Sequence, residues 1–433
     1  MSATFVFATL FGLLIVLILL RVPVSFSLAL AVLPILFLAD RVTPVMLLQR
    51  MMRSYGSFIL LSVPFFILAA KIMNSSGITQ RLIRMANVLV GWLPGGLGHI
   101  NVAVSMLFAG ISGSSQADAA GIGSVLIPAM IKQKYDARFT VAVTACSAVM
   151  GTIIPPSINM VVWGGVLNVS VGALFLAGIL PGIILGLSQM GLVAVFAYKR
   201  KYPVESKASL PEFVGASKDS LLAMLTPIII IGGIVGGLVT PTEASLVAVL
   251  YSAMLGFLVY KSLKHTDIAP LLLETIKLAS IALFAVGTAS IFGWVLGFFQ
   301  IPRYLISIVS TITTNPTGVL FIVAAIFLLV GSFMDAIPAI VILGPLLRPM
   351  AEAVQIHPLH FSTVGIVALG FGLITPPYGL TLLISSHIAG INSMEAMREV
   401  SVFLFVMLLV LVALIVFPSI SLFIPRLLVP QLF

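Results

Sequence analysis

The chain is a succession of long apolar stretches separated by short polar or basic segments. A helix needs about 20 apolar residues, at about 1.5 Å each, to cross the roughly 30 Å hydrocarbon core of a bilayer. The pattern predicts spans over 5–20, 24–39, 55–73, 139–168, 171–198, 221–239, 242–260, 276–299 and 403–428. We therefore expect an all-α polytopic membrane protein whose 433 residues leave room for ten or more spans.

A polar break divides one apolar region into two arms that are each too short to span a membrane. The break covers residues 110–118, and the arms cover 97–111 and 119–131, which are 15 and 13 residues long. Such arms predict a re-entrant hairpin whose tip stops near the membrane midplane, where irregular backbone needs protein or a wet cavity around it. A second hairpin is predicted over 317–350, with its break at 331–335.

A Pro-Pro pair interrupts the helix that follows each hairpin. Proline lacks a backbone N–H and clashes with the preceding turn, so a helix breaks there. The first broken helix is predicted over 139–168 with its break at 151–157, and the second over 362–388 with its break at 372–379. The sequence therefore repeats one motif, a hairpin followed by a broken helix.

The two copies of this motif have matching spacings. Asp118 precedes Pro128 by ten residues, and Asp335 precedes Pro345 by ten. Five predicted spans separate the two hairpins, and an odd number places the hairpins on opposite sides of the membrane. We expect an inverted-topology repeat in which two re-entrant helical hairpins and two broken helices meet at the midplane.

These elements predict a chain of five parts. They are N-terminal scaffold spans with an interfacial helix (1–96), a first transport repeat (97–198, with hairpin 97–131 and broken helix 139–168), a linker (199–219), scaffold spans of the second repeat (220–316), and a second transport repeat (317–433, with hairpin 317–350, broken helix 362–388 and the last span). The linker is cytoplasmic by the positive-inside rule, because it carries five cations. This orientation leaves Arg41, Arg50 and Arg53 outside, on the interfacial amphipathic helix expected over 40–53.

Composition narrows the class of protein further. Charged residues make up 8% of the chain, against about 25% in soluble domains, and hydrophobic residues make up 60%. The net charge of +9 arises mostly from loop lysines and arginines that hold the cytoplasmic side, which argues against nucleic acid as a partner. Residues 5–20 lack a basic n-region and are expected to be a first span rather than a cleaved signal. The single Cys146 excludes an internal disulfide and a cysteine metal cluster.

The breaks supply ligands for ions without a buried full charge. A broken helix exposes unpaired carbonyls at the end of one half and unpaired amides at the start of the other. Hard oxygen ligands suited to Na⁺ are offered by the hydroxyls and backbone at Ser112, Ser114, Ser115, Thr152, Gly331, Ser332, Gly372 and Thr375. The amide ends and nearby polar groups suited to a substrate carboxylate are at Ser157, Asn159, Tyr378 and Thr381.

Several of these polar residues also have a purely structural interpretation. Asp118 and Asp335 each stand directly before a helical arm, where aspartate is a strong N-cap, and the sequence leaves open whether they also bind an ion. Thr240 and Glu243 form a capping box with Pro241 at the first helical position, so we expect a structural role for them.

The combination of motifs is similar to one family. The segment 110–118, the Val-Pro-Phe-Phe span at 63–66, the Thr-Pro-Thr-Glu-Ala segment at 240–244 and the two Pro-Pro breaks resemble the large membrane subunit of tripartite ATP-independent periplasmic (TRAP) transporters. The resemblance covers essentially the whole chain. It implies an elevator-type secondary transporter of the ion-transporter superfamily in the bacterial inner membrane.

The resemblance also implies a function and partners. The transporter would use an inward Na⁺ gradient to import an organic acid, such as a C4-dicarboxylate, a sugar acid or a keto acid. A periplasmic substrate-binding protein would deliver the acid, and a small four-helix membrane subunit, a separate polypeptide here, would brace the scaffold. No cofactor is expected beyond the coupling ion, and no enzymatic activity.

The family's sodium sites lie at the hairpin tips and the broken helices that follow. Carried over to this sequence, they correspond to Ser112, Gly113, Ser114, Ser115, Gly151, Thr152, Pro155, Gly331, Ser332, Asp335, Gly372, Thr375 and Pro376. The resemblance does not specify which atoms coordinate the ion.

Two other functions remain as alternatives. One is a Na⁺/carboxylate symporter of the same superfamily that works without a binding protein. The other is an intramembrane hydrolase, because Gly-Ile-Ser-Gly at 110–113 imitates the Gly-x-Ser-Gly of membrane serine proteases and Asp118 with Asp335 imitates an aspartyl pair. A serine dyad needs a histidine facing Ser112, and the sequence places none at membrane depth in a suitable span.

Overall fold

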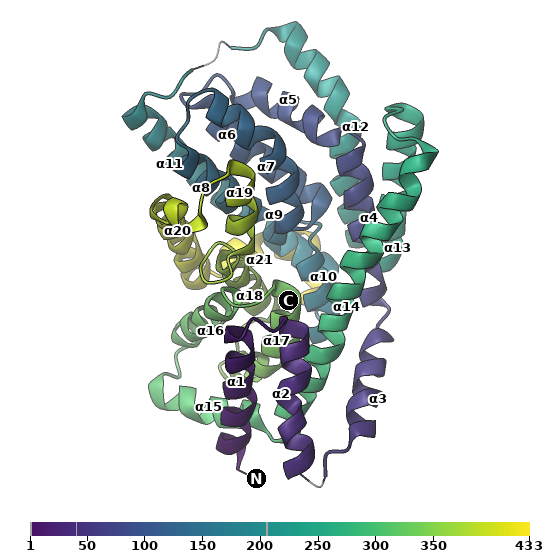
Figure 1. Cartoon of the computed structure of the whole chain (residues 1–433), viewed down its shortest axis with the longest axis vertical. Coiled ribbons are helices and arrows are strands. Elements are labelled where there is room, and N and C mark those ends of the chain that lie inside the picture. Colours follow the sequence, from purple (N-terminus) through teal and green to yellow (C-terminus); the bar gives the residue numbers. More distant parts are fainter. Residues whose placement is uncertain (1, 40, 205–206) are drawn as a thin grey trace.

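The computed structural model describes residues 2–39, 41–204 and 207–433, and within these residues it is helical without any strand. This confirms the predicted all-α class. Figure 1 shows the first repeat (blue) in the upper part of the molecule and most of the second repeat (green to yellow) below it, with α19 (Leu380–Ala389) of the second repeat beside α7 (Ser115–Lys132) of the first.

The helices before the first repeat and those between the repeats form most of the predicted scaffold. Before the first repeat lie α1 (Ala3–Leu19), α2 (Val24–Leu38), α3 (Pro44–Tyr55), the 3-10 helix η1 (Ile59–Leu61), α4 (Ser62–Ser75) and α5 (Ile78–Val90). Between the repeats lie α12 (Leu210–Val235), α13 (Pro241–Met254), the π-helix η2 (Leu255–Val259), the 3-10 helix η3 (His265–Asp267), α14 (Ile268–Phe298) and α15 (Ile301–Ile312).

The two repeats contain the hairpins and the broken helices. The first repeat comprises α6 (Gly96–Ser112), α7 (Ser115–Lys132), α8 (Ala137–Ala148), α9 (Met150–Ile153), α10 (Ile158–Leu167) and α11 (Val171–Arg200). The second comprises α16 (Pro316–Gly331), α17 (Ala336–Ala353), α18 (Pro358–Gly372), α19 (Leu380–Ala389), α20 (Ser393–Val416), α21 (Ser419–Leu428) and the 3-10 helix η4 (Pro430–Leu432).

Seven helical segments of the described chain are long and apolar enough to cross a membrane, or eight if the bent pair α3 and η1–α4 counts as one span. All five spans predicted between the hairpins are among them. The expected total of ten or more is not reached by this criterion, because α1 and α2 have only 17 and 15 residues. One of the seven is the 18-residue α17, which is an arm of the second hairpin.

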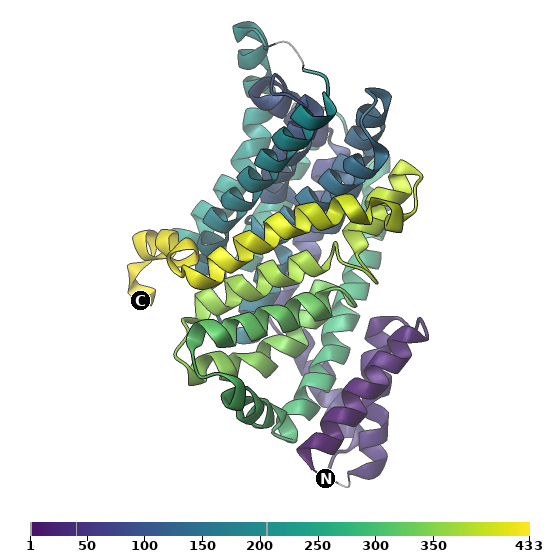
Figure 2. The same ribbon diagram turned by 90° about the vertical axis from the view of Figure 1, so that its left-hand side faces the viewer.

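Each repeat inserts its hairpin against the other repeat. In the first repeat α7 packs on α19, and in the second α17 packs on α10. Within each repeat the first hairpin arm packs on the first half of the broken helix, α6 on α8 and α16 on α18. Figure 2 shows α16, α18 and α20 side by side in the second repeat. The two motifs predicted from the sequence therefore form one interlocked body.

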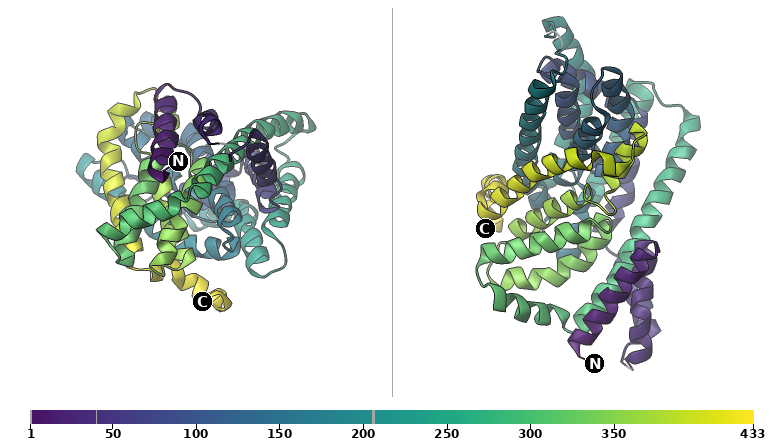
Figure 3. Two further views of the ribbon diagram at one scale, coloured as in Figure 1. Left: turned by 90° about the horizontal axis from the view of Figure 1, so that it is seen from below. Right: turned by 60° about the vertical axis from the view of Figure 1, so that its left-hand side comes forward.

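The scaffold helices pack along one side of this body. The helix α14 contacts α2, α3 and α4, and α13 packs on α4, while α1 packs on α2 and α15. Figure 3 shows α1 and α2 (purple) at one end of the molecule, beside α14.

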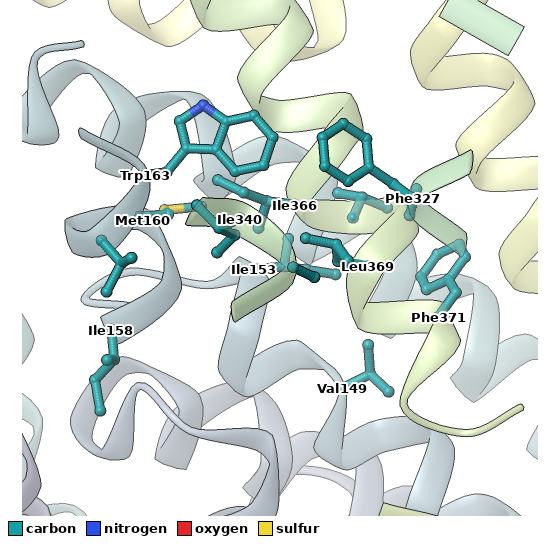
Figure 4. Packing of buried hydrophobic residues seen from close by; sticks show 14 of the residues in the cluster. Val149, Ile153, Ile158, Met160, Trp163, Phe327, Ile340, Ile366, Leu369 and Phe371 are labelled. Carbon is teal, nitrogen blue, oxygen red and sulfur yellow. The ribbon is translucent and has the colours of Figure 1, made fainter. Parts of the chain in front are cut away.

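An aromatic cluster joins the two repeats in the buried interior. The ring of Trp163 on α10 lies 5.3 Å from that of Phe327 on α16 and 5.8 Å from that of Phe361 on α18, measured between centroids. A methyl group on Gly365 would lie 2.3 Å from the indole, so glycine lets α18 approach α10 this closely. Figure 4 shows Trp163 and Phe327 near Ile366 of α18.

Several helices begin earlier than the sequence pattern predicted, among them α14, which starts eight residues before the predicted 276, and three of these early starts have polar caps. The linker expected over 199–219 is already helical from Leu210, because Ser209 and Glu212 form a capping box that starts α12. The last span, expected over 403–428, is α20 followed by α21, and a capping box at Asn392 and Glu395 starts α20. Similarly, α18 begins four residues before the predicted start, after an N-cap at His357. In these three helices a polar cap outweighs the weak apolar pattern of the first turn. The helix expected over 40–53 is present as α3, its interfacial position stays a prediction, and residue 40 lies outside the described residues.

Candidate functional site

The tip of the first hairpin is a tight two-residue break between α6 and α7. Gly113 has φ +61°, a left-handed conformation that favours glycine, and a methyl group there would lie 2.7 Å from the Pro156 carbonyl oxygen. The side chain of Ser114 is the N-cap of α7 and accepts a hydrogen bond from the Ala117 amide at 3.4 Å. The expectation that Asp118 caps this helix is therefore wrong, because Ser114 starts the helix four residues earlier and leaves Asp118 inside the first turn.

The carboxylate of Asp118 is fully buried beneath this tip. The hydroxyl of Ser112 donates a hydrogen bond to Oδ1, whereas Oδ2 has no hydrogen-bond partner. Gly151 lies on α9, and a methyl group there would lie 2.5 Å from Oδ2 and 2.9 Å from the Ser115 amide nitrogen. The helix α9 is therefore in direct contact with the tip. The site therefore holds one carboxylate oxygen that is shielded from water and unsatisfied.

Two hydroxyls predicted as ligands share one carbonyl of the broken helix. Ser115 Oγ and Thr152 Oγ1 donate to the Val149 carbonyl oxygen at 3.4 Å and 2.8 Å. Both side chains are buried, and both oxygens keep lone pairs that can accept a further contact. The hydroxyls thus line the region next to Asp118.

The tip of the second hairpin is built differently at the equivalent aspartate. Asp335 is the N-cap of α17, as predicted, and accepts a hydrogen bond from the Ala336 amide at 2.8 Å. Its side chain is only partly buried. A methyl group on Gly372 would lie 2.4 Å from the carbonyl carbon of Gly331, so the second broken helix also touches its hairpin tip through a glycine.

Each hairpin tip is tied to the break of the helix that follows it. The Ile158 amide donates to the Gly113 carbonyl at 3.2 Å, and the Tyr378 amide donates to the Ser332 carbonyl at 2.9 Å. Both breaks contain a cis bond between their two prolines. The Tyr378 amide, which the sequence suggested for a carboxylate, is therefore used within the second repeat in this conformation.

The hydroxyls predicted at the breaks form hydrogen bonds within their own broken helix. The hydroxyl of Ser157 donates to the Thr152 carbonyl at 2.7 Å, Thr381 donates to the Leu373 carbonyl at 2.9 Å, and Thr375 donates to the Phe371 carbonyl at 2.9 Å. Ser157 and Thr381 are buried, whereas Tyr378 is 39% exposed. Asn159, on the first turn of α10, is almost fully buried.

One contact between the two hairpin tips was not predicted from the sequence. The side-chain amide of Gln116 on α7 donates a hydrogen bond to Asp335 Oδ1 at 2.9 Å. These residues are 219 positions apart, so spacing along the chain gives no signal for the contact.

Two of the predicted residues have the structural role that the sequence indicated. Thr240 and Glu243 form the expected capping box of α13, in which the Thr240 amide donates to Glu243 Oε2 at 2.7 Å. Ser112 donates to Asp118 rather than to a histidine, which is not the arrangement that activates a serine nucleophile.

The fold and this site define a class of protein. Paired hairpins and broken helices that meet at a polar centre within a highly apolar helical chain are typical of secondary transporters. Comparison with known proteins agrees. Residues 11–420 match the family described as the tripartite ATP-independent periplasmic transporter, DctM component, and the chain belongs to this family of TRAP transporter large permeases.

Similar proteins cover nearly the same length. The sialic acid TRAP transporter large permease protein of Vibrio cholerae is 38% identical over 405 residues, which is 94% of this chain and 95% of that relative. The C4-dicarboxylate large permease of Pseudomonas aeruginosa is 36% identical over 369 residues, 85% of this chain and 86% of the relative. The 2,3-diketo-L-gulonate large permease of Escherichia coli is 31% identical over 397 residues, 92% of this chain and 93% of the relative. The chain is thus a multi-pass bacterial membrane permease, and its family implies a small membrane subunit and a periplasmic binding protein as partners.

Proposed function

We propose that this protein imports an organic acid across the bacterial inner membrane by symport with Na⁺. The acid is delivered by a periplasmic substrate-binding protein, and the chain works with a small membrane subunit. The relatives are named for sialic acid, C4-dicarboxylates and 2,3-diketo-L-gulonate, which are all organic acids. This common chemistry supports an organic acid as the substrate here.

The observation that carries the Na⁺ coupling is the unpartnered Oδ2 of Asp118. A buried carboxylate without a partner is costly, and a cation beside it removes that cost. The hydroxyls of Ser115 and Thr152 and the backbone of the tip supply oxygens of the kind that hard cations prefer. Of the predicted sodium ligands, Ser112, Gly113, Ser114, Ser115, Gly151, Thr152 and Pro155 belong to this first site, and Gly331, Ser332, Asp335, Gly372, Thr375 and Pro376 to a second.

The substrate carboxylate binds between the two breaks. Tyr378 offers an exposed phenol, and Ser157, Asn159 and Thr381 lie on the first turns of α10 and α19 or just before them. The positive ends of these helix dipoles attract an anion without a buried arginine or lysine. Na⁺ at the tips orders the backbone around this carboxylate site, so the ion and the acid bind together.

Alternating access follows an elevator mechanism. The hairpins and broken helices move as one body against a scaffold of α1–α4 and α12–α14. The interlocked packing of α7 on α19 and of α17 on α10 supports a single moving body. No covalent chemistry takes place.

Reconstitution of the chain with its small subunit in proteoliposomes tests this function. Uptake of a radiolabelled acid should require an inward Na⁺ gradient and a binding protein loaded with that acid. Uptake driven equally well by a pH gradient without Na⁺ would reject sodium coupling. Uptake of free acid without the binding protein would instead support the binding-protein-independent symporter.

A further inference from the structure

The hydrogen bond between Gln116 and Asp335 joins the two hairpin tips across the centre of the molecule. We propose that Gln116 is a positioning residue that couples Na⁺ binding at the two tips. This inference rests on the proposed Na⁺ symport and adds a residue from the first hairpin to the site of the second. The donor is the side-chain amide of Gln116, and the acceptor is Asp335 Oδ1 at 2.9 Å.

Gln116 and Asp118 occupy the same first turn of α7 but different faces of it. Residues two apart on a helix point in different directions. Asp118 lies against Ser112 and Gly151, within its own repeat, while Gln116 reaches the second hairpin. A cation that binds Asp118 therefore acts on the turn that also carries Gln116.

The Asp335 carboxylate depends on this contact because its own hairpin fills only part of its hydrogen-bonding capacity. Oδ1 accepts from the Ala336 amide and from Gln116, and the side chain is partly open. A hydrogen bond to a charged acceptor is stronger than one between neutral groups and fixes the direction of the carboxylate. Gln116 thus orients the Asp335 carboxylate to bind an ion at the second tip. Because coupling between two sites is reciprocal, an ion at either tip favours binding at the other.

Na⁺ binding to the purified full-length chain in nanodiscs tests this coupling without any transport assay. Na⁺ that binds only the folded state raises the unfolding temperature, so titration with NaCl at constant ionic strength gives an apparent affinity. Gln116→Met keeps the length and helix propensity of the side chain but removes the donor. We expect the apparent Na⁺ affinity to fall about tenfold, since hydrogen bonds to charged groups contribute at least this much. Gln80→Ala, at an exposed position on α5, is the control and should leave the affinity unchanged.

A double-mutant cycle separates coupling from a general structural effect. Gln116→Met, Asp335→Asn and the double variant are titrated in parallel. If the two residues act through their contact, the double variant binds Na⁺ about as weakly as Asp335→Asn alone. Additive losses, or an unchanged affinity in Gln116→Met, would overturn the inference.

A second measurement tests the proximity of the two side chains without a Na⁺ titration. Cysteines at positions 116 and 335, in a Cys146→Ala background, should be joined by a short bifunctional thiol reagent, and failure to join them in folded protein would also overturn the inference.

The proposed symport and the coupling between the tips can fail independently of each other. If Na⁺ binding depends on Gln116 as predicted but the wild-type protein takes up no organic acid, the proposed symport is contradicted. The coupling between the two tips is then still supported.

Discussion

At the scale of single residues, the two hairpin aspartates differ although each stands ten residues before a proline. Asp118 lies one turn inside α7, fully buried, with one oxygen unpartnered. Asp335 caps α17 and is partly exposed. The difference arises because Ser114 is available as an earlier N-cap, whereas Ser332 bonds back to the Leu329 carbonyl at 2.7 Å and leaves the capping to Asp335. The first tip is therefore the stronger candidate for a sealed cation site.

Asp118→Asn should weaken Na⁺ dependence most strongly among the tip substitutions. The amide keeps the size of the side chain but removes the negative charge that compensates a buried cation. We expect the Na⁺ concentration for half-maximal uptake to rise at least tenfold in proteoliposomes. Asp136→Asn is the matched control, because asparagine caps α8 as well as aspartate does at this surface position. Equal Na⁺ dependence in wild type and Asp118→Asn would remove this carboxylate from the coupling mechanism.

Gly151→Ala should damage the same site sterically. The added methyl group would lie 2.5 Å from Asp118 Oδ2 and 2.9 Å from the Ser115 amide nitrogen, so the tip and α9 must separate. Overpacking of this kind costs about 1–3 kcal/mol. We expect Na⁺-dependent uptake to fall by about tenfold or more, while Gly191→Ala, which has open space around it on α11, should transport normally. Normal uptake by Gly151→Ala would contradict this steric argument, because it would show that the tip accommodates the added methyl group.

At the scale of elements, the sequence predicted the hairpins and breaks within a few residues. Half-length apolar arms and Pro-Pro pairs are local signals, and the hairpins expected over 97–131 and 317–350 are α6–α7 and α16–α17. The starts of α12 and α20 were missed because their first turns are polar, and only capping contacts identify them. The cap of α7 was assigned to the wrong residue because serine and aspartate cap helices about equally well, so local propensity does not choose between them. The contact between Gln116 and Asp335 depends on how two distant repeats interlock, which no local pattern encodes.

Trp163→Ala should loosen the packing of α10 on α16 and α18. The indole is fully buried between Phe327 and Phe361, and truncation of such a side chain costs about 3–5 kcal/mol. We expect a clear drop in the unfolding temperature of the purified protein, measured by intrinsic fluorescence. Trp92→Ala, whose ring is 38% exposed, should lower it far less. Equal shifts in the two variants would contradict a central role for this cluster.

At the scale of the whole molecule, the hairpin of each repeat packs against the broken helix of the other, so each repeat needs the other to bury its hairpin. The arm α7 packs on α19 and the arm α17 packs on α10, while the scaffold meets this body along other helices. A body held together in this way can move as a unit, provided that its contacts with the scaffold are able to slide. One such contact lies between Gly165 on α10 and Ile59 on η1, where a methyl group on the glycine would lie 3.3 Å from Ile59 Cβ.

A disulfide across this boundary should therefore stop transport. The pair Ile59→Cys and Gly165→Cys, in a Cys146→Ala background, places two Cβ atoms close to the separation that a disulfide requires. Oxidation should abolish uptake, and reduction should restore it, because the proposed elevator movement requires α10 to slide against η1. The pair Thr313→Cys and Gly318→Cys has the same Cβ separation of 3.3 Å but links positions only five residues apart across the short connection between α15 and α16. This disulfide adds little restraint beyond the chain itself, so its oxidation should leave uptake intact. If the first disulfide forms fully and uptake continues, α10 does not slide against η1, and alternating access must arise from movement of the hairpin tips alone.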